Sequence, residues 1–139
     1  MKRAVKVILF ELDKDQECLK TVISRLETET LQEEQRSEHQ DLFLTLLDQY
    51  GRDDIGVIFI FFFNILRLKK GQALLSTPDE PHAYLSGEVV ECMANSDNTV
   101  RGGLTPKYKD TDILYEMLPY QNMELPRQPI DGRLLVETQ

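Results

Sequence analysis

Apolar residues recur at helical spacing in the first part of the chain. Beyond Asp15 they fall three or four positions apart, which predicts an amphipathic helix; they are Leu19, Val22, Ile23 and Leu26. A second helix is expected to begin at Ser37, which forms a capping-box pattern with Gln40, and to end at Gly51. Its apolar stripe comprises Leu42, Phe43, Leu46, Leu47 and Tyr50. The polar residues 27–40 are interpreted as a helix end followed by a solvated linker.

The most apolar stretch lies at residues 57–63, within the run IGVIFIFFFNILRL. It is far shorter than the roughly 20 apolar residues that a spanning helix needs, so we expect no membrane segment. Its enrichment in Ile, Val and Phe predicts a buried strand. A turn at residues 69–71 and a returning strand at residues 72–75 would complete a hairpin.

The remaining pattern is mostly that of short strands. Residues 82–85 and 88–94 contain alternating apolar positions and predict further strands. Asp110 or Thr111 is expected to cap a short helix at 112–118. Residues 1–12 fit either a strand or one helical turn.

The sequence therefore predicts a fold that is mainly β, and α+β overall. A helical segment at 1–51 would precede strands and a short helix at 52–120. The prolines and the glycine within residues 121–139 predict an irregular tail.

Charge and cysteine content narrow the class of protein. Among 139 residues the formal net charge is −8, which argues against a nucleic-acid partner or an anionic membrane surface. Cys18 and Cys92 are too few for a disulfide framework, so we expect free thiols. The apolar run near the start is broken by Lys6 and lacks a cleavage site, which favours a cytoplasmic protein. His39, in the first turn of the second helix, is interpreted as a surface residue.

Candidate chemistry is concentrated in residues 80–107. His82 follows a proline, and Arg101 lies among flexible residues and acids, a combination that suits a metal or sugar-phosphate site. The residues alone also fit simpler alternatives. His82 could form a structural hydrogen bond, and Arg101 could pair with Asp97 or Glu91 at the surface.

The run HAYLSGEVVECMANSDNTVRGGLTPK at 82–107 closely resembles the signature of type I phosphomannose isomerases, which are zinc enzymes of the cupin class. The similarity extends from about Glu17, through DDIGVIFIFFFNILRLKKGQALL, to ILYEMLPY at 113–120, and corresponds to the middle of that family. It implies a partial cupin jelly-roll sheet preceded by the end of an inserted helical domain. It also implies interconversion of mannose 6-phosphate and fructose 6-phosphate, a step in carbohydrate metabolism that supplies GDP-mannose.

The same resemblance assigns roles to the two central residues. His82 matches a zinc-ligating histidine of the family. Arg101 matches its catalytic arginine, whose planar guanidinium would stabilise negative charge as an enediol-like intermediate forms. Gly102 stands where the family usually has alanine.

Four further residues occupy positions of the signature. Glu91 and Asp97 are the candidates for catalytic proton transfer between adjacent carbons of the sugar, and the sequence does not choose between them. Tyr84 and Lys107 are implied to bind the sugar-phosphate substrate, Lys107 as a point charge for phosphate or hydroxyl groups.

The other zinc ligands of the family have no match. The family holds zinc with four protein groups, including a Gln-x-His pair, and the sequence contains no Gln-x-His. His82 is thus the single matching ligand. We therefore predict a truncated mannose-6-phosphate isomerase that is inactive by itself. The alternative is a non-catalytic, degenerate cupin fragment without a complete zinc site.

Overall fold

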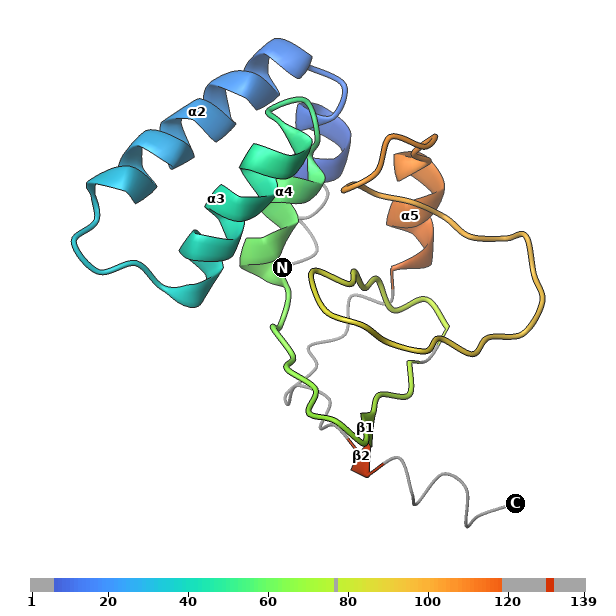
Figure 1. Ribbon diagram of the computed structural model, residues 1–139. Coiled ribbons are helices and arrows are strands. Elements are labelled where there is room, and N and C mark those ends of the chain that lie inside the picture. The colour runs from blue at the N-terminus through green and yellow to red at the C-terminus, as the bar shows by residue number, and fades with distance from the viewer. Residues whose placement is uncertain (1–6, 77, 119–129, 132–139) are drawn as a thin grey trace.

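The computed structural model describes residues 7–76, 78–118 and 130–131, and helices dominate this part of the chain (Figure 1). In order, the elements are a π-helical turn η1 (Val7–Leu12), the helices α2 (Gln16–Gln32), α3 (Glu38–Tyr50) and α4 (Gly56–Phe59), the 3-10 turn η2 (Ile60–Phe62), the strand β1 (Gln72–Ala73), the helix α5 (Thr111–Met117) and the strand β2 (Ile130–Asp131). The irregular tail predicted at 121–139 lies outside the described residues, apart from β2.

The two predicted long helices are confirmed. Asp15 caps α2, because its carboxylate accepts the Cys18 N–H at 3.0 Å. The capping box of Ser37 and Gln40 begins α3, and Gly51, at φ +77°, ends it. α2 extends through the polar stretch to Gln32, so the linker is shorter than the pattern suggests.

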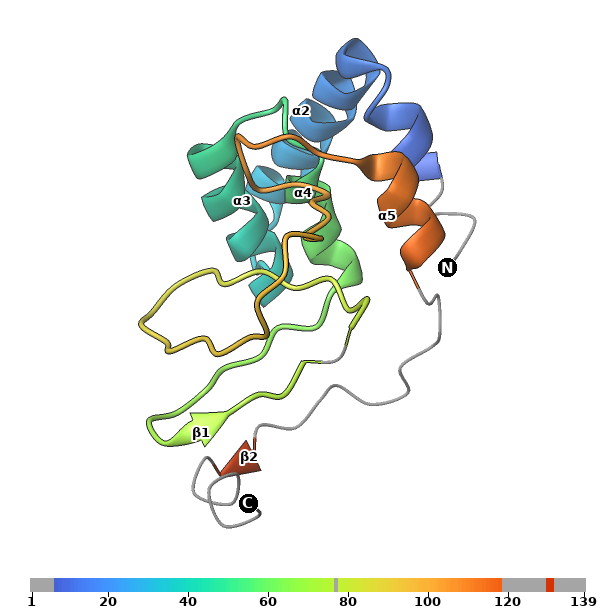
Figure 2. The same ribbon diagram turned by 90° about the vertical axis from the view of Figure 1, so that its right-hand side faces the viewer.

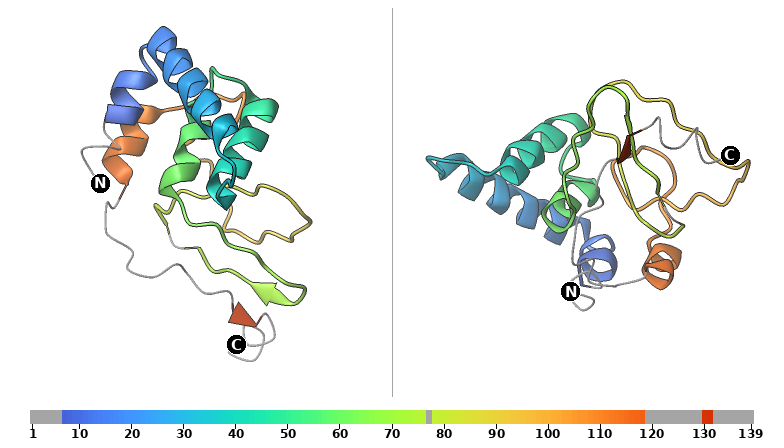
Figure 3. Two further views of the ribbon diagram at one scale, coloured as in Figure 1. Left: turned by 90° about the vertical axis from the view of Figure 1, so that its left-hand side faces the viewer. Right: turned by 90° about the horizontal axis from the view of Figure 1, so that it is seen from below.

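One apolar core joins α2, α3 and the short helical segment that follows them. Figures 1 and 3 show α2 and α3 side by side, with α4 on their inner side. The buried members of the core are Leu19, Ile23, Phe43, Leu46, Leu47, Ile55, Val57, Ile58 and Ile60. This helical body is the support against which the rest of the described chain packs.

The prediction of a strand at 57–63 is wrong, because these residues lie mostly in α4 and η2. A short apolar run without a period fits a buried helix as well as a buried strand. The deciding contact is local: the buried carboxylate of Asp54 accepts the Gly56 N–H at 2.7 Å and turns the backbone into the helix. α3 then covers the apolar side chains that a neighbouring strand would otherwise cover.

The predicted cupin sheet is also wrong, and the mainly β fold class with it. Residues 82–85 and 88–94 contain no strand, and the Val90 side chain is 99% exposed. The turn at 69–71 does form, with Gly71 at φ +84°. However, β1 pairs in antiparallel fashion with β2, in the register Gln72↔Asp131, and not with the apolar run. An alternating segment becomes a strand only when another strand satisfies its backbone hydrogen bonds.

The short helix near residue 112 is confirmed as α5, which Asp110 caps by accepting the Ile113 N–H at 3.1 Å. It packs against η1, where Tyr115 and Phe10 meet edge to face at 4.7 Å between ring centroids. Cys18 and Cys92 are both free and exposed, as expected. Every helix within the described ranges is too short or too polar to cross a membrane.

Candidate active site

The residues predicted to carry the chemistry lie in a long irregular segment beside the helical body. Figures 1 and 2 show this segment as loops that leave η2, extend away from the helices, and return to α4 before α5 begins. Its far part, near residue 90, is exposed, whereas residues 101–105 are half-buried where the chain returns. The predicted site residues are therefore divided between two environments.

His82 lies in the exposed part, and its ring is oriented by the backbone. Its Nδ1 atom is 2.9 Å from the carbonyl oxygen of Glu80. Because a carbonyl oxygen can only accept, Nδ1 carries the proton, and in the neutral ring the lone pair then lies on Nε2. This is the tautomer that a zinc-ligating histidine adopts when a backbone carbonyl fixes it. His82 therefore fits the role of a single metal ligand.

Tyr84 and Glu91 are brought together with His82. The Tyr84 hydroxyl donates to Glu91 Oε1 at 2.8 Å, and the rings of Tyr84 and His82 lie 5.6 Å apart between centroids. The hydrogen bond to Glu91, together with partial burial and the negative charge, raises the pKa of the Tyr84 phenol above its ordinary value. The turn at Gly87, with φ +104°, allows the two segments to meet.

We expect Glu91→Gln to lower the pKa of Tyr84 toward the ordinary phenol value of about 10. The neutral amide still accepts the hydrogen bond but no longer opposes the charge of the phenolate. Since the folded-state pKa is raised, the contact contributes stability below the unfolded pKa and loses it as pH rises through the folded value. The absorbance of tyrosinate, followed against pH, measures the titration. The Tyr84→Phe variant shows which part of the titration curve belongs to Tyr84. Glu88→Gln, which removes the charge of a nearby exposed carboxylate, is the control. A curve for Glu91→Gln that superimposes on the wild type would contradict the assignment.

Arg101 lies where the chain returns to the helices. Its carbonyl oxygen accepts the Asp110 N–H at 3.1 Å, and its side chain is half-buried. Among the described residues its guanidinium forms no ion pair, so the surface pairs considered with Asp97 and Glu91 are absent there. Neither His82 nor Arg101 lies in a strand, contrary to the cupin sheet that the resemblance implies for this segment.

The last two predicted residues are both exposed. Asp97 lies in the far loop, and within the described ranges the structure gives its carboxylate no hydrogen-bond partner. Lys107 lies just after residues 101–105, which we call the returning loop. Its backbone N–H donates to Thr105 Oγ1 at 3.2 Å. Their roles stay predictions. His39, predicted to be a surface residue, is half-buried, and its Nε2 lies 3.0 Å from the Phe63 carbonyl oxygen.

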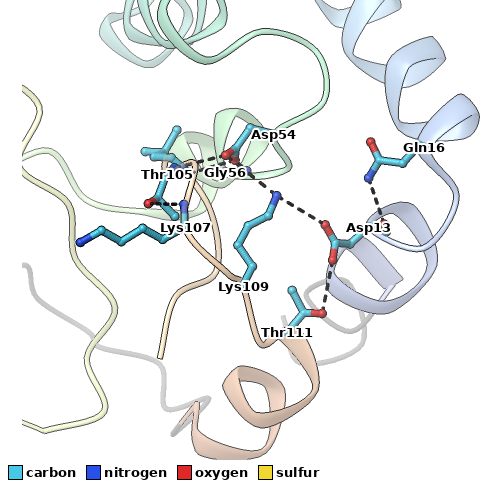
Figure 4. A network of polar contacts seen from close by, with 9 residues as sticks. Asp13, Gln16, Asp54, Gly56, Thr105, Lys107, Lys109 and Thr111 are labelled. Carbon is cyan, nitrogen blue, oxygen red and sulfur yellow. Dashed lines mark hydrogen bonds and ion pairs between the residues drawn. The ribbon is translucent and has the colours of Figure 1, made fainter. Parts of the chain in front are cut away.

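A residue that the sequence did not single out organises the returning loop. The side chain of Asp54 accepts three backbone N–H groups: Oδ1 accepts those of Gly56 and Leu104 at 2.7 and 2.9 Å, and Oδ2 accepts that of Thr105 at 3.3 Å (Figure 4). Asp54 is only 7% exposed. Its carboxylate therefore joins the start of α4 to the residues that follow Arg101. The acid before Ile-Gly was the available sequence signal, since short acids often cap turns.

Two glycines allow the backbones to meet at this point. A Cβ atom on Gly103 would lie 2.5 Å from Gly56 Cα and 2.9 Å from Asp54 Oδ1. A Cβ atom on Gly56 would lie 2.6 Å from the Leu104 nitrogen. Both positions therefore require glycine for steric reasons.

The charge network extends from Asp54 to α5 (Figure 4). The Lys109 ammonium lies between two carboxylates, 4.0 Å from Asp54 Oδ2 and 3.9 Å from Asp13 Oδ1. Thr111, the first residue of α5, donates from its hydroxyl to Asp13 Oδ2 at 3.3 Å. Asp13 in turn lies between η1 and α2, so the network links the starts of α2, α4 and α5.

No cluster of three or more potential metal ligands occurs among the residues that the structure describes. His82 is the one predicted ligand, and the lone pair on Nε2 of its neutral ring is compatible with that role. A zinc ion at this histidine would need further ligands from residues outside the described ranges.

Comparison with curated proteins finds related segments in several isomerases. Mannose-6-phosphate isomerase 2 of Arabidopsis thaliana is 50% identical over 105 residues, which cover 73% of this chain and 24% of that protein. Mannose-6-phosphate isomerase of Cryptococcus neoformans var. neoformans is 43% identical over 106 residues, with shares of 76% and 24%. The Macaca fascicularis enzyme of the same name is 55% identical over 80 residues, with shares of 58% and 19%.

These relatives are isomerases by name. The chain is homologous to a part of the mannose-6-phosphate isomerases, which confirms its partial resemblance to that family. It spans about a fifth to a quarter of the length of these relatives. No protein-family model matches the chain, and no solved structure matches it.

Proposed function

We propose that this chain provides the arginine-bearing segment of a zinc-dependent mannose-6-phosphate isomerase. The observation that carries the proposal is the 50% identity over 105 residues to an isomerase of that name. The substrate is a sugar phosphate, and the reaction interconverts mannose 6-phosphate and fructose 6-phosphate. The mannose 6-phosphate that forms supplies GDP-mannose synthesis in the cytoplasm.

In this proposal Arg101 acts on the charge that develops at the first two oxygens of the sugar. Its guanidinium is permanently charged and presents a planar fork of donors, which suits two adjacent oxygens. A fixed donor set stabilises the enediolate more than the neutral sugar, and this difference lowers the barrier. The half-buried position of Arg101 supports this role, because the surrounding chain limits its conformations.

Other residues of the signature handle protons and binding. Glu91 or Asp97 moves the proton between the two carbons, and the hydrogen bond from Tyr84 supports Glu91 by holding its carboxylate in one orientation. Lys107 binds phosphate or hydroxyl groups through its exposed ammonium group.

His82 would hold zinc through Nε2, and a bound zinc ion would supply Lewis-acid polarisation of the sugar carbonyl. The sequence supplies one of the family's four ligands, and three or four are normally needed for a zinc site. The 139-residue chain on its own is therefore proposed to be inactive.

The role of Arg101 can be tested in a hybrid enzyme, in which the homologous residues of this chain replace their counterparts in the Arabidopsis thaliana isomerase. We expect Arg101→Lys to lower kcat by about a hundredfold or more, with a smaller change in KM, because lysine keeps the charge and loses the fork. Steady-state kinetics with fructose 6-phosphate measure both constants.

The matched control is Arg67→Lys, since Arg67 is an exposed arginine that pairs with Glu38 in the helical body. It should leave kcat within about twofold of the parent hybrid, as expected for an exposed ion pair of little energetic weight. An unchanged kcat for Arg101→Lys would mean that this arginine is structural.

A further inference from the structure

The segment after Arg101 has a composition that should make it mobile. Gly102 and Gly103 follow directly. Glycine has no Cβ atom, so its backbone can adopt more conformations than that of any other residue. A catalytic arginine needs a defined position relative to the substrate. Some contact must therefore remove the freedom of the two glycines.

We propose that Asp54 is a positioning residue for Arg101, an inference that rests on the catalytic role proposed above for that arginine. The Asp54 carboxylate binds the N–H groups of Leu104 and Thr105, the first two residues beyond the glycines. On the near side, the Arg101 carbonyl accepts the Asp110 N–H. The backbone is thus held on both sides of the glycine pair.

The packing of the glycines supports the same conclusion. Gly103 lies directly on the backbone of Gly56, at the start of α4. Gly102 faces the side chain of Leu114 on α5, and a Cβ atom there would lie 2.3 Å from Leu114 Cδ2. The loop therefore sits between α4 and α5, and Asp54 supplies its polar attachment (Figure 4).

The site requires a carboxylate and not an amide. Both oxygens of Asp54 accept hydrogen bonds from the backbone, and Lys109 lies beside Oδ2. An asparagine could accept on one side, but its NH2 group would face either the Thr105 N–H and the Lys109 ammonium, or the N–H groups of Gly56 and Leu104. A donor placed against a donor leaves the buried groups unsatisfied.

The test uses Asp54→Asn in the full 139-residue chain and NMR as the readout. We expect the amide hydrogens of Leu104 and Thr105 to exchange at least about tenfold faster, while the amides of Leu19 and Phe43 in the core keep their rates. We also expect the Nε–Hε signal of Arg101 to shift and sharpen. A purely structural role of Asp54 in starting α4 would not change that signal.

Asp53→Asn is the matched control, because Asp53 is the adjacent acid and its exposed carboxylate pairs with Lys20 at 2.9 Å. It should change neither the exchange rates nor the Arg101 signal. An unchanged Arg101 signal in Asp54→Asn, or unchanged exchange at Leu104, would overturn the proposal.

Should Asp54→Asn fail to fold, Lys109→Met tests the same attachment, with Lys20→Met as its control. It removes the cation beside Asp54. We expect faster exchange of the Leu104 amide hydrogen and a shifted, sharper Arg101 signal, both by a smaller amount than in Asp54→Asn. Identical spectra around Arg101 in Lys109→Met and Lys20→Met would then overturn the proposal. None of these readouts uses catalysis, so an inactive hybrid enzyme would count against the proposed function and not against this inference.

Discussion

Replacing Phe43 with alanine is expected to lower the free energy of unfolding by about 3–5 kcal/mol. Phe43 lies on α3, is 0% exposed, and packs against Phe61 with 5.3 Å between ring centroids. Its ring joins α3 to the α4 and η2 segment, so truncation leaves a cavity that the short helices cannot fill without moving. Because whole domains are stable by only about 5–15 kcal/mol, this loss is large.

Urea denaturation followed by far-ultraviolet circular dichroism measures the change in the free energy of unfolding. Leu31→Ala is the control, because Leu31 is a large apolar residue on α2 that is 58% exposed. Its effect should stay within about 0.5 kcal/mol. Equal effects of the two substitutions would mean that Phe43 is not at the centre of the core.

Gly103→Ala is expected to destabilise the chain by about 2–3 kcal/mol, as overpacking in a fixed site does. The added Cβ atom would lie 2.5 Å from the Cα atom and 2.6 Å from the nitrogen of Gly56. These are backbone atoms at the start of α4, held by the hydrogen bond to Asp54, so they cannot rotate away. Relief of the clash requires the loop after Arg101 to leave α4.

Gly102→Ala provides a matched comparison one residue earlier. There the Cβ atom meets Leu114 Cδ2 at 2.3 Å, which is the end of a side chain that can change rotamer. The expected cost is below about 1 kcal/mol, in keeping with the alanine that the isomerase signature usually has at this position. Urea denaturation curves for both variants measure their free energies of unfolding, which can then be compared. A greater loss from Gly102→Ala than from Gly103→Ala would contradict the backbone contact.

Local sequence signals were sufficient to predict the helical part of the fold. The capping box of Ser37 and Gln40, the terminating Gly51 and the cap at Asp110 all depend on contacts within four residues, and the structure confirms each of them. The apolar run at 57–63 was assigned wrongly because it has no period to separate helix from strand. The strands at 82–94 were assigned wrongly because alternation indicates only the capacity to pair, and partners for pairing lie elsewhere in a chain.

The candidate site shows the same division between local and distant information. His82, Tyr84 and Glu91 lie within ten positions of one another, and the structure brings them together. Asp54 could not be found in this way, because its partners Leu104 and Thr105 are 50 and 51 positions away in the sequence. Such contacts depend on how α4 and the returning loop pack, which a pattern of residue types does not encode.

The most direct test of the account is the turnover of the unsubstituted hybrid enzyme described above. If this chain provides the arginine-bearing segment of a mannose-6-phosphate isomerase, its residues should replace the homologous residues of the Arabidopsis thaliana enzyme with function retained. We predict a hybrid that converts fructose 6-phosphate with kcat within about tenfold of the parent, a difference of about 1.4 kcal/mol in activation free energy. A hybrid that folds like the parent, yet shows no turnover above a blank, would contradict the account and favour a non-catalytic relative.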